Sequence, residues 1–403
     1  MKILQICPDF PPHVRGGGAE TFRLLAEAWT TMGNDVHVVT SFPLKSSSSE
    51  KTEQFGFSVK FFKLLPTVGI FREAAYFFPA GFLETIRLVR NIRNLATNSD
   101  IIVIHSIMET VPLISLFTLR KFSSKVVVTS YGISTASYSR VLSFLSRILY
   151  GSIGKIAISN MRNIFVYSDI SRKEFVALFN KEGRFSIYCY TLGTDVSRLL
   201  RAYNEVILKE NSYNKWLTND LGIDRPFVLS IGRNVRTKGF DILIDAFSAL
   251  TLNYPDLMLI IAGDITDYTE ELRQLSRNLN LDGKVKFIGR IDEFKKVYLM
   301  THCRCLIIPS RKEGYGLNAV EARIFMIPTV ATRTGAHEEI LDLPDINKLI
   351  DAGNKEQLHN AILAIMKTPR QKPEFDVTAA KKYDISSLAQ HYIDFANSKL
   401  IFE

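Results

Sequence analysis

One stretch constrains this chain more than any other, because it joins a buried-strand pattern, a glycine-rich loop and a helical pattern. The apolar run Cys305 to Pro309 predicts a buried strand, and the pattern from Leu317 to Phe325 predicts a helix. Glycines between them allow close approach of the backbone, and N–H groups at a helix start can hold a phosphate. Glu313 lies in the loop and Glu321 in the helix, with seven residues between them. The stretch therefore predicts an anion site with a carboxylate on each side.

A second loop carries positive charge at the end of another predicted strand. The strand is Phe227 to Ile231, and Arg233 and Lys238 follow it before a helical pattern begins. Cations at such a position can neutralise a negatively charged leaving group. This loop is therefore a second candidate for binding an anionic ligand.

The N-terminal residues predict an α/β unit. Lys2 to Cys7 and Asp35 to Thr40 have the pattern of strands, and about Ala19 to Met32 has that of the helix between them. The loop after the first strand contains three consecutive glycines, Gly16, Gly17 and Gly18. Open α/β sheets bind ligands at the carboxyl ends of their strands, so this loop is a further candidate site. It lacks the G-x-G-x-x-G pattern, which disfavours a dinucleotide-dependent dehydrogenase.

The net charge of +9 is unevenly distributed along the chain. Residues 1–193 carry 22 Lys and Arg against 13 Asp and Glu, whereas residues 194–403 carry 28 of each kind. A basic first half predicts an anionic partner, either nucleic acid or a lipid surface. No nucleic-acid-binding module is recognisable in the sequence, so we favour an anionic membrane surface.

An aromatic segment in the first half strengthens the membrane hypothesis. Gly69 to Phe82 is unusually rich in aromatic residues, and the helical pattern after it alternates arginines with apolar residues. Aromatic and basic residues together are typical of an interfacial anchor, although the helix has the pattern of an ordinary amphipathic crossover as well. The candidates for membrane or acceptor contact are Phe71, Tyr76, Phe77, Phe78, Arg87, Arg90 and Arg93.

The rest of the composition predicts a peripheral protein. No run of 18 uncharged apolar residues predicts a spanning helix, and the first residues predict a core strand instead of a signal peptide. The cysteines lie in strand-like runs and are expected to be buried free thiols: Cys7, Cys189, Cys303 and Cys305. We expect a cytoplasmic protein that associates with the cytoplasmic face of the membrane.

The motifs resemble the retaining GT-B glycosyltransferases of family 4, glycosyl transferases group 1. The resemblance rests on E-x7-E within S-x-x-E-G-Y-G, on G-R-x4-K-G at Gly232, and on the glycine loop near the N-terminus. It covers nearly the whole chain and is more specific in the second half. It implies an α/β fold of two facing Rossmann-like domains with a cleft between them and a C-terminal helix crossing back to the first. Residues 1–193 with a helix at about 385–403 would bind the acceptor, and residues 194–384 the donor.

The resemblance also implies roles for individual residues. Glu313 would face the transferred sugar, Glu321 would bind the ribose, and Arg233 and Lys238 would bind the phosphates. The full set of implied donor contacts is Gly16, Gly17, Gly18, Arg233, Lys238, Gly263, Ile288, Arg290, Glu313, Gly314, Tyr315, Gly316, Leu317 and Glu321.

One departure from the family pattern concerns the reacting centre. A histidine of an H-G pair often ends a strand of the first domain in this family, and Tyr131 stands at that place here. Tyr131 either supplies a hydroxyl or simply packs. His105 ends a neighbouring predicted strand and is either a second catalytic candidate or a satisfied histidine near the core edge.

The resemblance implies transfer of a sugar from a UDP- or GDP-linked donor to an acceptor hydroxyl with retention. A lipid-linked or membrane-associated glycan acceptor is expected, as is activity without a metal or other cofactor. Two alternatives stay open, namely a GT-B nucleotide-sugar 2-epimerase and a non-catalytic glycosyltransferase-like subunit. The sequence leaves open the sugar, the base, the acceptor and the choice between front-face attack and a covalent intermediate.

Overall fold

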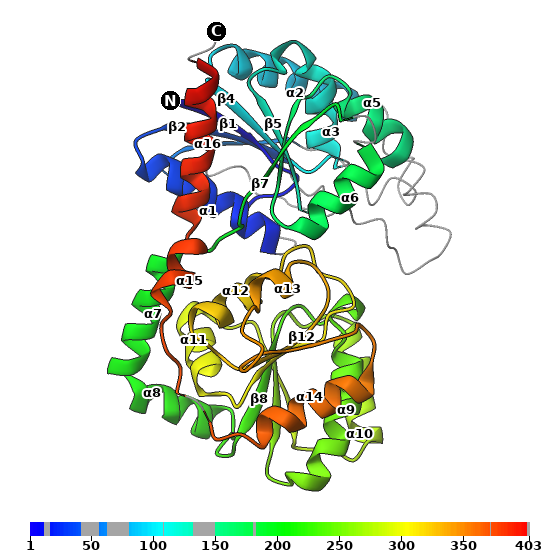
Figure 1. The fold of residues 1–403 in the computed structure, drawn as a ribbon, viewed down its shortest axis with the longest axis vertical. Coiled ribbons are helices and arrows are strands. Elements are labelled where there is room, and N and C mark those ends of the chain that lie inside the picture. The colour runs from blue at the N-terminus through cyan, green and yellow to red at the C-terminus, as the bar shows by residue number, and fades with distance from the viewer. Residues whose placement is uncertain are drawn as a thin grey trace. The chain divides into compact units, whose positions relative to one another are not determined.

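A computed structural model of the chain describes residues 1–11, 17–41, 56–62, 80–107, 109–131, 150–179, 183–370 and 372–400. The chain divides into two compact units (Figure 1). Unit 1 comprises Met1–Gly193 and Ile385–Glu403, and unit 2 comprises Thr194–Asp384. Unit 1 is therefore built from two separate parts of the sequence.

The described residues of unit 1 form a seven-stranded parallel sheet in the order β3-β2-β1-β4-β5-β6-β7. Its strands are β1 (Lys2–Ile6), β2 (Asp35–Ser41), β3 (Ser58–Phe62), β4 (Ile101–His105), β5 (Val126–Ser130), β6 (Asn163–Val166) and β7 (Ser186–Cys189). The direction in which strands are added reverses between β1 and β4. In open parallel sheets, such a reversal places the ligand site at the carboxyl ends of the strands.

Successive side chains of β1 point to opposite faces of this sheet. Leu4 and Ile6 belong to a fully buried apolar core with Leu88 and Ile92, whereas Gln5 points to the opposite face and donates to the carbonyl of Phe22. Helices cover both faces (Figure 1). They are α1 (Gly17–Thr31), α2 (Ala80–Thr97), α3 (Thr110–Thr118), α5 (Lys155–Ile158), α6 (Asp169–Phe179) and α16 (Ile385–Leu400).

The C-terminal helix α16 completes unit 1 by packing against α1, as the sequence predicted. Trp29 of α1 is fully buried and donates its indole N–H to the carbonyl of Ala389 at 3.1 Å. Its ring meets the ring of Tyr392 edge-on, with centroids 5.3 Å apart. Burial of a large aromatic side chain with its polar N–H satisfied makes this contact a main attachment of α16.

Unit 2 contains a six-stranded parallel sheet in the order β10-β9-β8-β11-β12-β13. Its strands are β8 (Phe227–Ile231), β9 (Met258–Ala262), β10 (Val285–Gly289), β11 (Leu306–Ile308), β12 (Thr329–Thr332) and β13 (Lys348–Ile350). The order reverses between β8 and β11, which are the strands that precede the two candidate anion-binding loops. Because the strands are parallel, both loops lie at the same edge of the sheet.

Helices cover both faces of the second sheet as well (Figure 1). They are α7 (Val196–Leu208), α8 (Glu210–Lys215), α9 (Phe240–Asn253), α10 (Tyr268–Asn278), α11 (Glu293–His302), α12 (Leu317–Ile324), α13 (His337–Ile340), α14 (Lys355–Met366) and α15 (Val377–Lys382). Side-chain caps fix several helix starts: Asp195 accepts from the Arg198 N–H at α7, and Asp292 accepts from the Lys295 N–H at α11.

One expectation from the sequence is wrong, and one falls outside the described residues. Cys189 is exposed, because it ends β7 at the edge of the sheet, whereas Cys7, Cys303 and Cys305 are buried as predicted. The aromatic segment with Phe71, Tyr76, Phe77 and Phe78 lies outside the described residues, as does Gly16.

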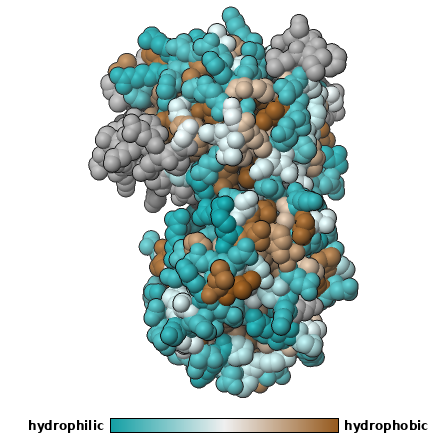
Figure 2. All heavy atoms as spheres, turned by 90° about the vertical axis from the view of Figure 1, so that its left-hand side faces the viewer, coloured by the Kyte–Doolittle hydropathy of each residue, from teal (hydrophilic) through white to brown (hydrophobic). Residues whose placement is uncertain are grey.

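Two features of the described part of the chain bear on a possible membrane-spanning segment: the polarity of one face and the length of the helices. The face seen in Figure 2 is mostly hydrophilic, with hydrophobic residues in separate patches, as is common on protein surfaces. None of the described helices is long and apolar enough to cross a membrane.

The attachment of α16 predicts the effect of one core substitution. Trp29→Ala should lower the free energy of unfolding of unit 1 by about 3–5 kcal/mol, because it leaves a cavity between α1 and α16. Met32→Ala, which truncates the 38% exposed residue after the same helix, should cost no more than about 0.5 kcal/mol. Urea unfolding followed by circular dichroism measures both, and equal losses would contradict the packing described here.

Candidate functional site

The two candidate loops of unit 2 touch each other at the carboxyl ends of β8 and β11. Gly239 has φ +68°, and a Cβ built on it would lie 2.1 Å from the carbonyl oxygen of Pro309. Only glycine fits so close an approach in this conformation. The side chain of Arg311 adds a bond to the carbonyl of Arg236 at 2.9 Å. The basic loop is therefore held directly against the end of the neighbouring strand.

The contact brings together two residues that the sequence singled out separately. Lys238 Nζ lies 2.5 Å from Glu313 Oε1, and the side chains are 22% and 14% exposed. Ser310 Oγ donates to the same carboxylate oxygen at 2.7 Å. Burial by itself raises the pKa of Glu313, but the charge and hydrogen bond of Lys238 outweigh it, so the pKa lies below its ordinary value. Glu313 is thus an ionised hydrogen-bond acceptor next to a cation.

The start of α12 completes this edge of the sheet. Gly316 precedes the helix with φ +111°, and Asn318 in the first turn donates to the carbonyl of Ile231 at the end of β8. The N–H groups of a helix start carry partial positive charge. Arg233 is exposed in the adjoining loop. The site therefore offers Lys238, Arg233 and a helix N-terminus to a negatively charged ligand.

His337 is a buried neighbour of this site that the sequence did not single out. Its Nδ1 lies 2.8 Å from the carbonyl oxygen of Thr332, which can only accept, so Nδ1 carries the proton. Its Nε2 has no hydrogen-bond partner among the described residues and faces Gly316, where a Cβ would lie 2.6 Å away. Burial lowers the pKa of His337 despite the nearby Glu313 carboxylate, so the ring is neutral. In the sequence, the position of His337 shortly after Gly335 could have drawn attention to it.

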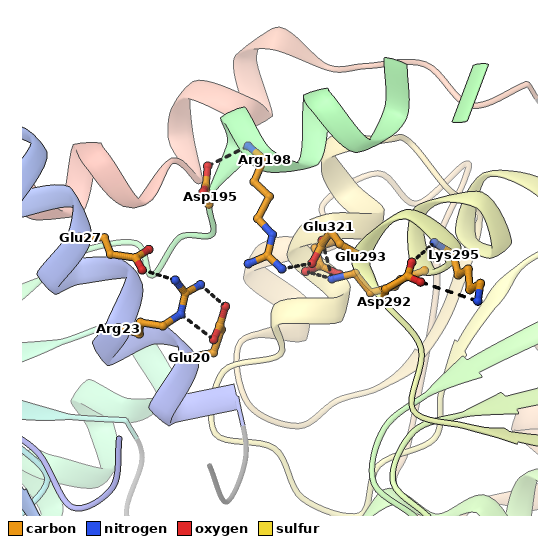
Figure 3. Close-up of polar contacts among 10 residues, drawn as sticks. Glu20, Arg23, Glu27, Asp195, Arg198, Asp292, Glu293, Lys295 and Glu321 are labelled. Atoms are coloured by element: carbon orange, nitrogen blue, oxygen red, sulfur yellow. Dashed lines mark hydrogen bonds and ion pairs between the residues drawn. The ribbon is translucent and has the colours of Figure 1, made fainter. Parts of the chain in front are cut away.

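Glu321 has an entirely different environment from Glu313. It is 6% exposed and pairs with Lys296 of α11, whose Nζ lies 2.7 Å from Glu321 Oε1 and 2.9 Å from Glu293 Oε1. Arg198 of α7 reaches Glu293 at 3.5 Å (Figure 3). Burial raises the pKa of Glu321 more than the charge of Lys296 lowers it. Sequence reasoning missed Lys296, Glu293 and Arg198, because only the packing of helices brings them to Glu321.

The structure favours the core alternative for His105. The residue is fully buried on β4, and its ring stacks on Phe22 with centroids 4.5 Å apart. The Gln5 side-chain amide donates to Nε2 at 3.0 Å, and the hydroxyls of Thr129 and Tyr131 lie 3.0 Å from Nδ1. Burial lowers the pKa of His105 to about 3. A neutral histidine with both ring nitrogens engaged has no group left for a substrate.

Tyr131 also directs its hydroxyl inward. Besides His105, the hydroxyl contacts that of Tyr167 at 3.4 Å, and Tyr167 in turn contacts the hydroxyl of Tyr392 at 2.6 Å. Its ring meets Phe22 edge-on at 5.5 Å. These contacts favour the packing role among the two alternatives for Tyr131.

The remaining predicted residues are distributed along the strand ends and helix starts. Ile288 is half-buried on β10 and Arg290 is exposed just after it, while Gly263 at the end of β9 donates its N–H to the Gly289 carbonyl. In the central loop Gly314 is exposed, Tyr315 is buried and Leu317 is half-buried. In unit 1, Gly17 and Gly18 begin α1, and Arg87, Arg90 and Arg93 are exposed on α2.

No group of three or more metal-ligating side chains occurs among the residues that the structure describes. The positive groups at this place in unit 2 are Lys238, Arg233 and the N–H groups at the start of α12. All of them surround the carboxyl ends of β8 and β11.

Comparison with solved structures defines the class of fold. The chain matches Anabaena HepE in complex with UDP at a TM-score of 0.72 and 20% identity, over 99% of this chain and 100% of that one. It matches the sucrose-phosphate synthase of Thermosynechococcus elongatus at a TM-score of 0.73 and 16% identity, over the full length of both. The fold is GT-B, with two Rossmann-like parallel sheets, as the motifs implied.

Comparison of sequences supports the family resemblance in the second half of the chain. Residues 218–382 match the model of glycosyl transferases group 1, which confirms the resemblance over those residues. An uncharacterised glycosyltransferase of Methanocaldococcus jannaschii is 32% identical over 40% of this chain and 44% of its own length. The phosphatidyl-myo-inositol mannosyltransferase of Mycobacterium leprae is 24% identical over 96% of this chain and 94% of its own. The chain spans less than half of the first relatives it matches, at 44% and 41%.

The burial of His105 predicts its titration. The folded-state pKa of about 3 lies below the ordinary value of 6.5, so the unfolded chain takes up the proton first. His105 therefore reduces stability as the pH falls from about 6.5 towards 3, and has no such effect above that window. In an NMR titration the ring resonances of His105, assigned with a His105→Gln variant, should stay in the neutral position from pH 8 to 5. A midpoint between 6 and 7 would contradict this placement.

Proposed function

We propose that the chain is a retaining glycosyltransferase that needs no metal. It moves a sugar from a UDP- or GDP-linked donor to the hydroxyl of an acceptor. The observation that carries this proposal is the Lys238–Glu313 pair at the meeting point of β8, β11 and the start of α12. A cation, an ionised acceptor and helix-start N–H groups are the groups that bind a diphosphate and the hydroxyls of a sugar.

The charges of this site suit departure of a nucleoside diphosphate. Negative charge grows on the leaving diphosphate as the bond to the sugar breaks, and Lys238, Arg233 and the α12 N–H groups can stabilise it. Without ligand, Lys238 is held by Glu313. A bound diphosphate would share this lysine, while Glu313 keeps its second oxygen for a sugar hydroxyl. Three positive groups thus take over the task that a divalent cation performs in other enzymes.

The relatives support a nucleotide-sugar donor. HepE of Anabaena binds UDP, and it has been solved with UDP-glucose as well. The relative in Mycobacterium leprae is named for mannosyl transfer to phosphatidyl-myo-inositol. These names suggest a hexose as the sugar and a membrane-associated molecule as the acceptor.

Nucleotide binding gives the first test of the proposal. Among UDP, GDP, ADP and their sugar conjugates, the nucleotide of the true donor should raise the melting temperature, because it binds only the folded state. Glu313→Gln should keep nucleoside diphosphate binding, since Lys238 is freed, and should lower kcat of transfer about a hundredfold or more. Transfer in excess chelator should be unchanged.

The matched control is Glu338→Gln, which removes an exposed carboxylate paired with Arg333 beside the site. It should leave kcat within about twofold of the wild type. Absence of any nucleotide effect, or unchanged transfer in Glu313→Gln, would favour a non-catalytic subunit. A C2 epimer formed without acceptor would favour the epimerase alternative.

We further propose that unit 1 binds the cytoplasmic face of an anionic membrane, where a lipid-linked acceptor is reached. On α2, Leu83 is 58% and Ile86 40% exposed beside exposed Arg87 and Arg90. The neighbouring α3 presents Phe117, 39% exposed, under the guanidinium of Arg120. Arginines that flank exposed apolar side chains suit the interface of an anionic bilayer.

Vesicle binding tests this surface. The wild type should bind vesicles that contain anionic lipid at low salt and be released as ionic strength rises. Replacing Arg87, Arg90 and Arg93 by Gln should weaken binding roughly tenfold or more. The same charge change at Arg201, Lys209 and Lys215, which are exposed on and between α7 and α8, should have little effect. Equal loss in both triple variants, or no binding at low salt, would exclude α2 as the membrane contact.

A further inference from the structure

We propose that Lys296 is a positioning residue that fixes the carboxylate of Glu321 and directs its free oxygen towards the ribose hydroxyls of the donor nucleotide. This inference rests on the proposed function. It assigns a role to a largely buried lysine of α11 that none of the sequence motifs includes. The argument uses the contacts of four side chains from three helices of unit 2: Arg198, Glu293, Lys296 and Glu321.

Lys296 lies between two carboxylates in a largely buried position. Its side chain is 17% exposed, and its Nζ bonds both Glu293 and Glu321, at 2.9 Å and 2.7 Å. Only Oε1 of Glu321 takes part in the bond. A single lysine therefore sets which way the Glu321 carboxylate is turned.

The other oxygen of Glu321 is the atom that needs a ligand. Oε2 is buried and has no hydrogen-bond partner within the described part of the chain. A buried acceptor without a donor costs free energy, so native structures usually supply one. A ribose presents two adjacent hydroxyl groups, and either of them can donate to the free oxygen Oε2 while Lys296 keeps Oε1. The hydroxyls of a nucleoside are thus a fitting partner for Oε2.

Lys296 also decides whether Glu321 carries charge. Burial comes first among the influences that raise the pKa of Glu321, and the negative charge of Glu293 raises it further, while Lys296 and Arg198 lower it. If Lys296 were removed, Arg198 would still contact Glu293, but Glu321 would lose the lysine that bonds its carboxylate while the negative charge of Glu293 stays nearby. The pKa of Glu321 would then rise, and a protonated Glu321 is a weaker acceptor for hydroxyls.

Arg198 holds this arrangement from the opposite side. It reaches Glu293 at 3.5 Å from the first turn of α7, a helix that is capped by Asp195 and packs along α11 (Figure 3). Glu293 is therefore held by two cations, and Lys296 is held by two carboxylates. The alternating row of charges is neutral as a whole, which reduces the cost of burying it.

Binding of two matched nucleotides tests the inference. The probes are UDP and 2′-deoxy-UDP, with GDP and 2′-deoxy-GDP beside them, titrated by calorimetry between pH 5.5 and 8. The wild type should bind the ribonucleotide of its own base more tightly than the deoxy form. Lys296→Gln should weaken ribonucleotide binding roughly tenfold and bring the ratio of the two dissociation constants close to one. Lys296→Arg should restore the ratio.

The pH profile separates positioning from a general structural role. In Lys296→Gln, ribonucleotide affinity should rise with pH across a range where the wild type is flatter, because Glu321 ionises at higher pH without its cation. Combining Lys296→Gln with Glu321→Gln should add little to the loss from Glu321→Gln alone. Lys295→Gln is the matched control: it removes the neighbouring lysine, which lies over Trp216 and is 37% exposed, and should change neither ratio nor profile.

The outcomes are distinguishable. If the wild type binds UDP or GDP and Lys296→Gln keeps both affinity and ratio within twofold, the positioning role is excluded. A wild-type ratio of one would overturn the ribose assignment of Glu321 and with it this inference. If none of the nucleotides binds the wild type, the proposed function itself fails. Should Lys296→Gln unfold, the Lys296→Arg and Glu321→Gln variants still measure the ratio, and a ratio unchanged in Glu321→Gln would overturn the inference.

Discussion

The close approach of Gly239 to the Pro309 carbonyl is the constraint on which the site of unit 2 depends. Each of the two loops follows a buried parallel strand whose direction is fixed by the core. Because β8 and β11 are neighbours, the loops share one edge of the sheet, and the missing Cβ of Gly239 lets their backbones touch. Lys238 is the residue just before this glycine, so its side chain reaches Glu313. The ion pair is a consequence of the backbone contact, and Arg311, in the loop after β11, reinforces that contact by bonding the carbonyl of Arg236 and the carboxylate of Asp241.

The two carboxylates of the E-x7-E pattern serve under opposite electrostatic conditions. Glu313 is next to Lys238, which holds its pKa low, whereas Glu321 is buried among helices where its pKa is raised. A carboxylate of the first kind stays charged at any physiological pH. One of the second kind depends on each cation around it. The charge of Glu321 therefore depends on its neighbours more than the charge of Glu313 does. Residues far away in the sequence, such as Arg198, influence it.

The sequence predicted the parts of this structure that follow from local pattern and backbone geometry. The strand Phe227–Ile231 has the predicted bounds, and the first two strands differ from the prediction by one residue at their ends, because apolar runs mark them clearly. The pairing of Lys238 with Glu313 was within reach, since both residues follow parallel strands. The cluster around Lys296 was not, because helix packing across unit 2 decides it. His105 shows the same limit: a histidine at a strand end has one sequence signature whether it faces solvent or, as here, Phe22.

The discontinuity of unit 1 has a consequence for how the chain is made. Helix α16 covers Trp29, yet the whole of unit 2 is encoded between them. During translation, α16 cannot pack on the apolar side of α1 before residues 385–400 have left the ribosome. Unit 2 is contiguous and can close its core earlier. The helix that covers Trp29 is therefore among the last parts of the chain to be made, and a chain that ends before residue 385 lacks part of the core of unit 1.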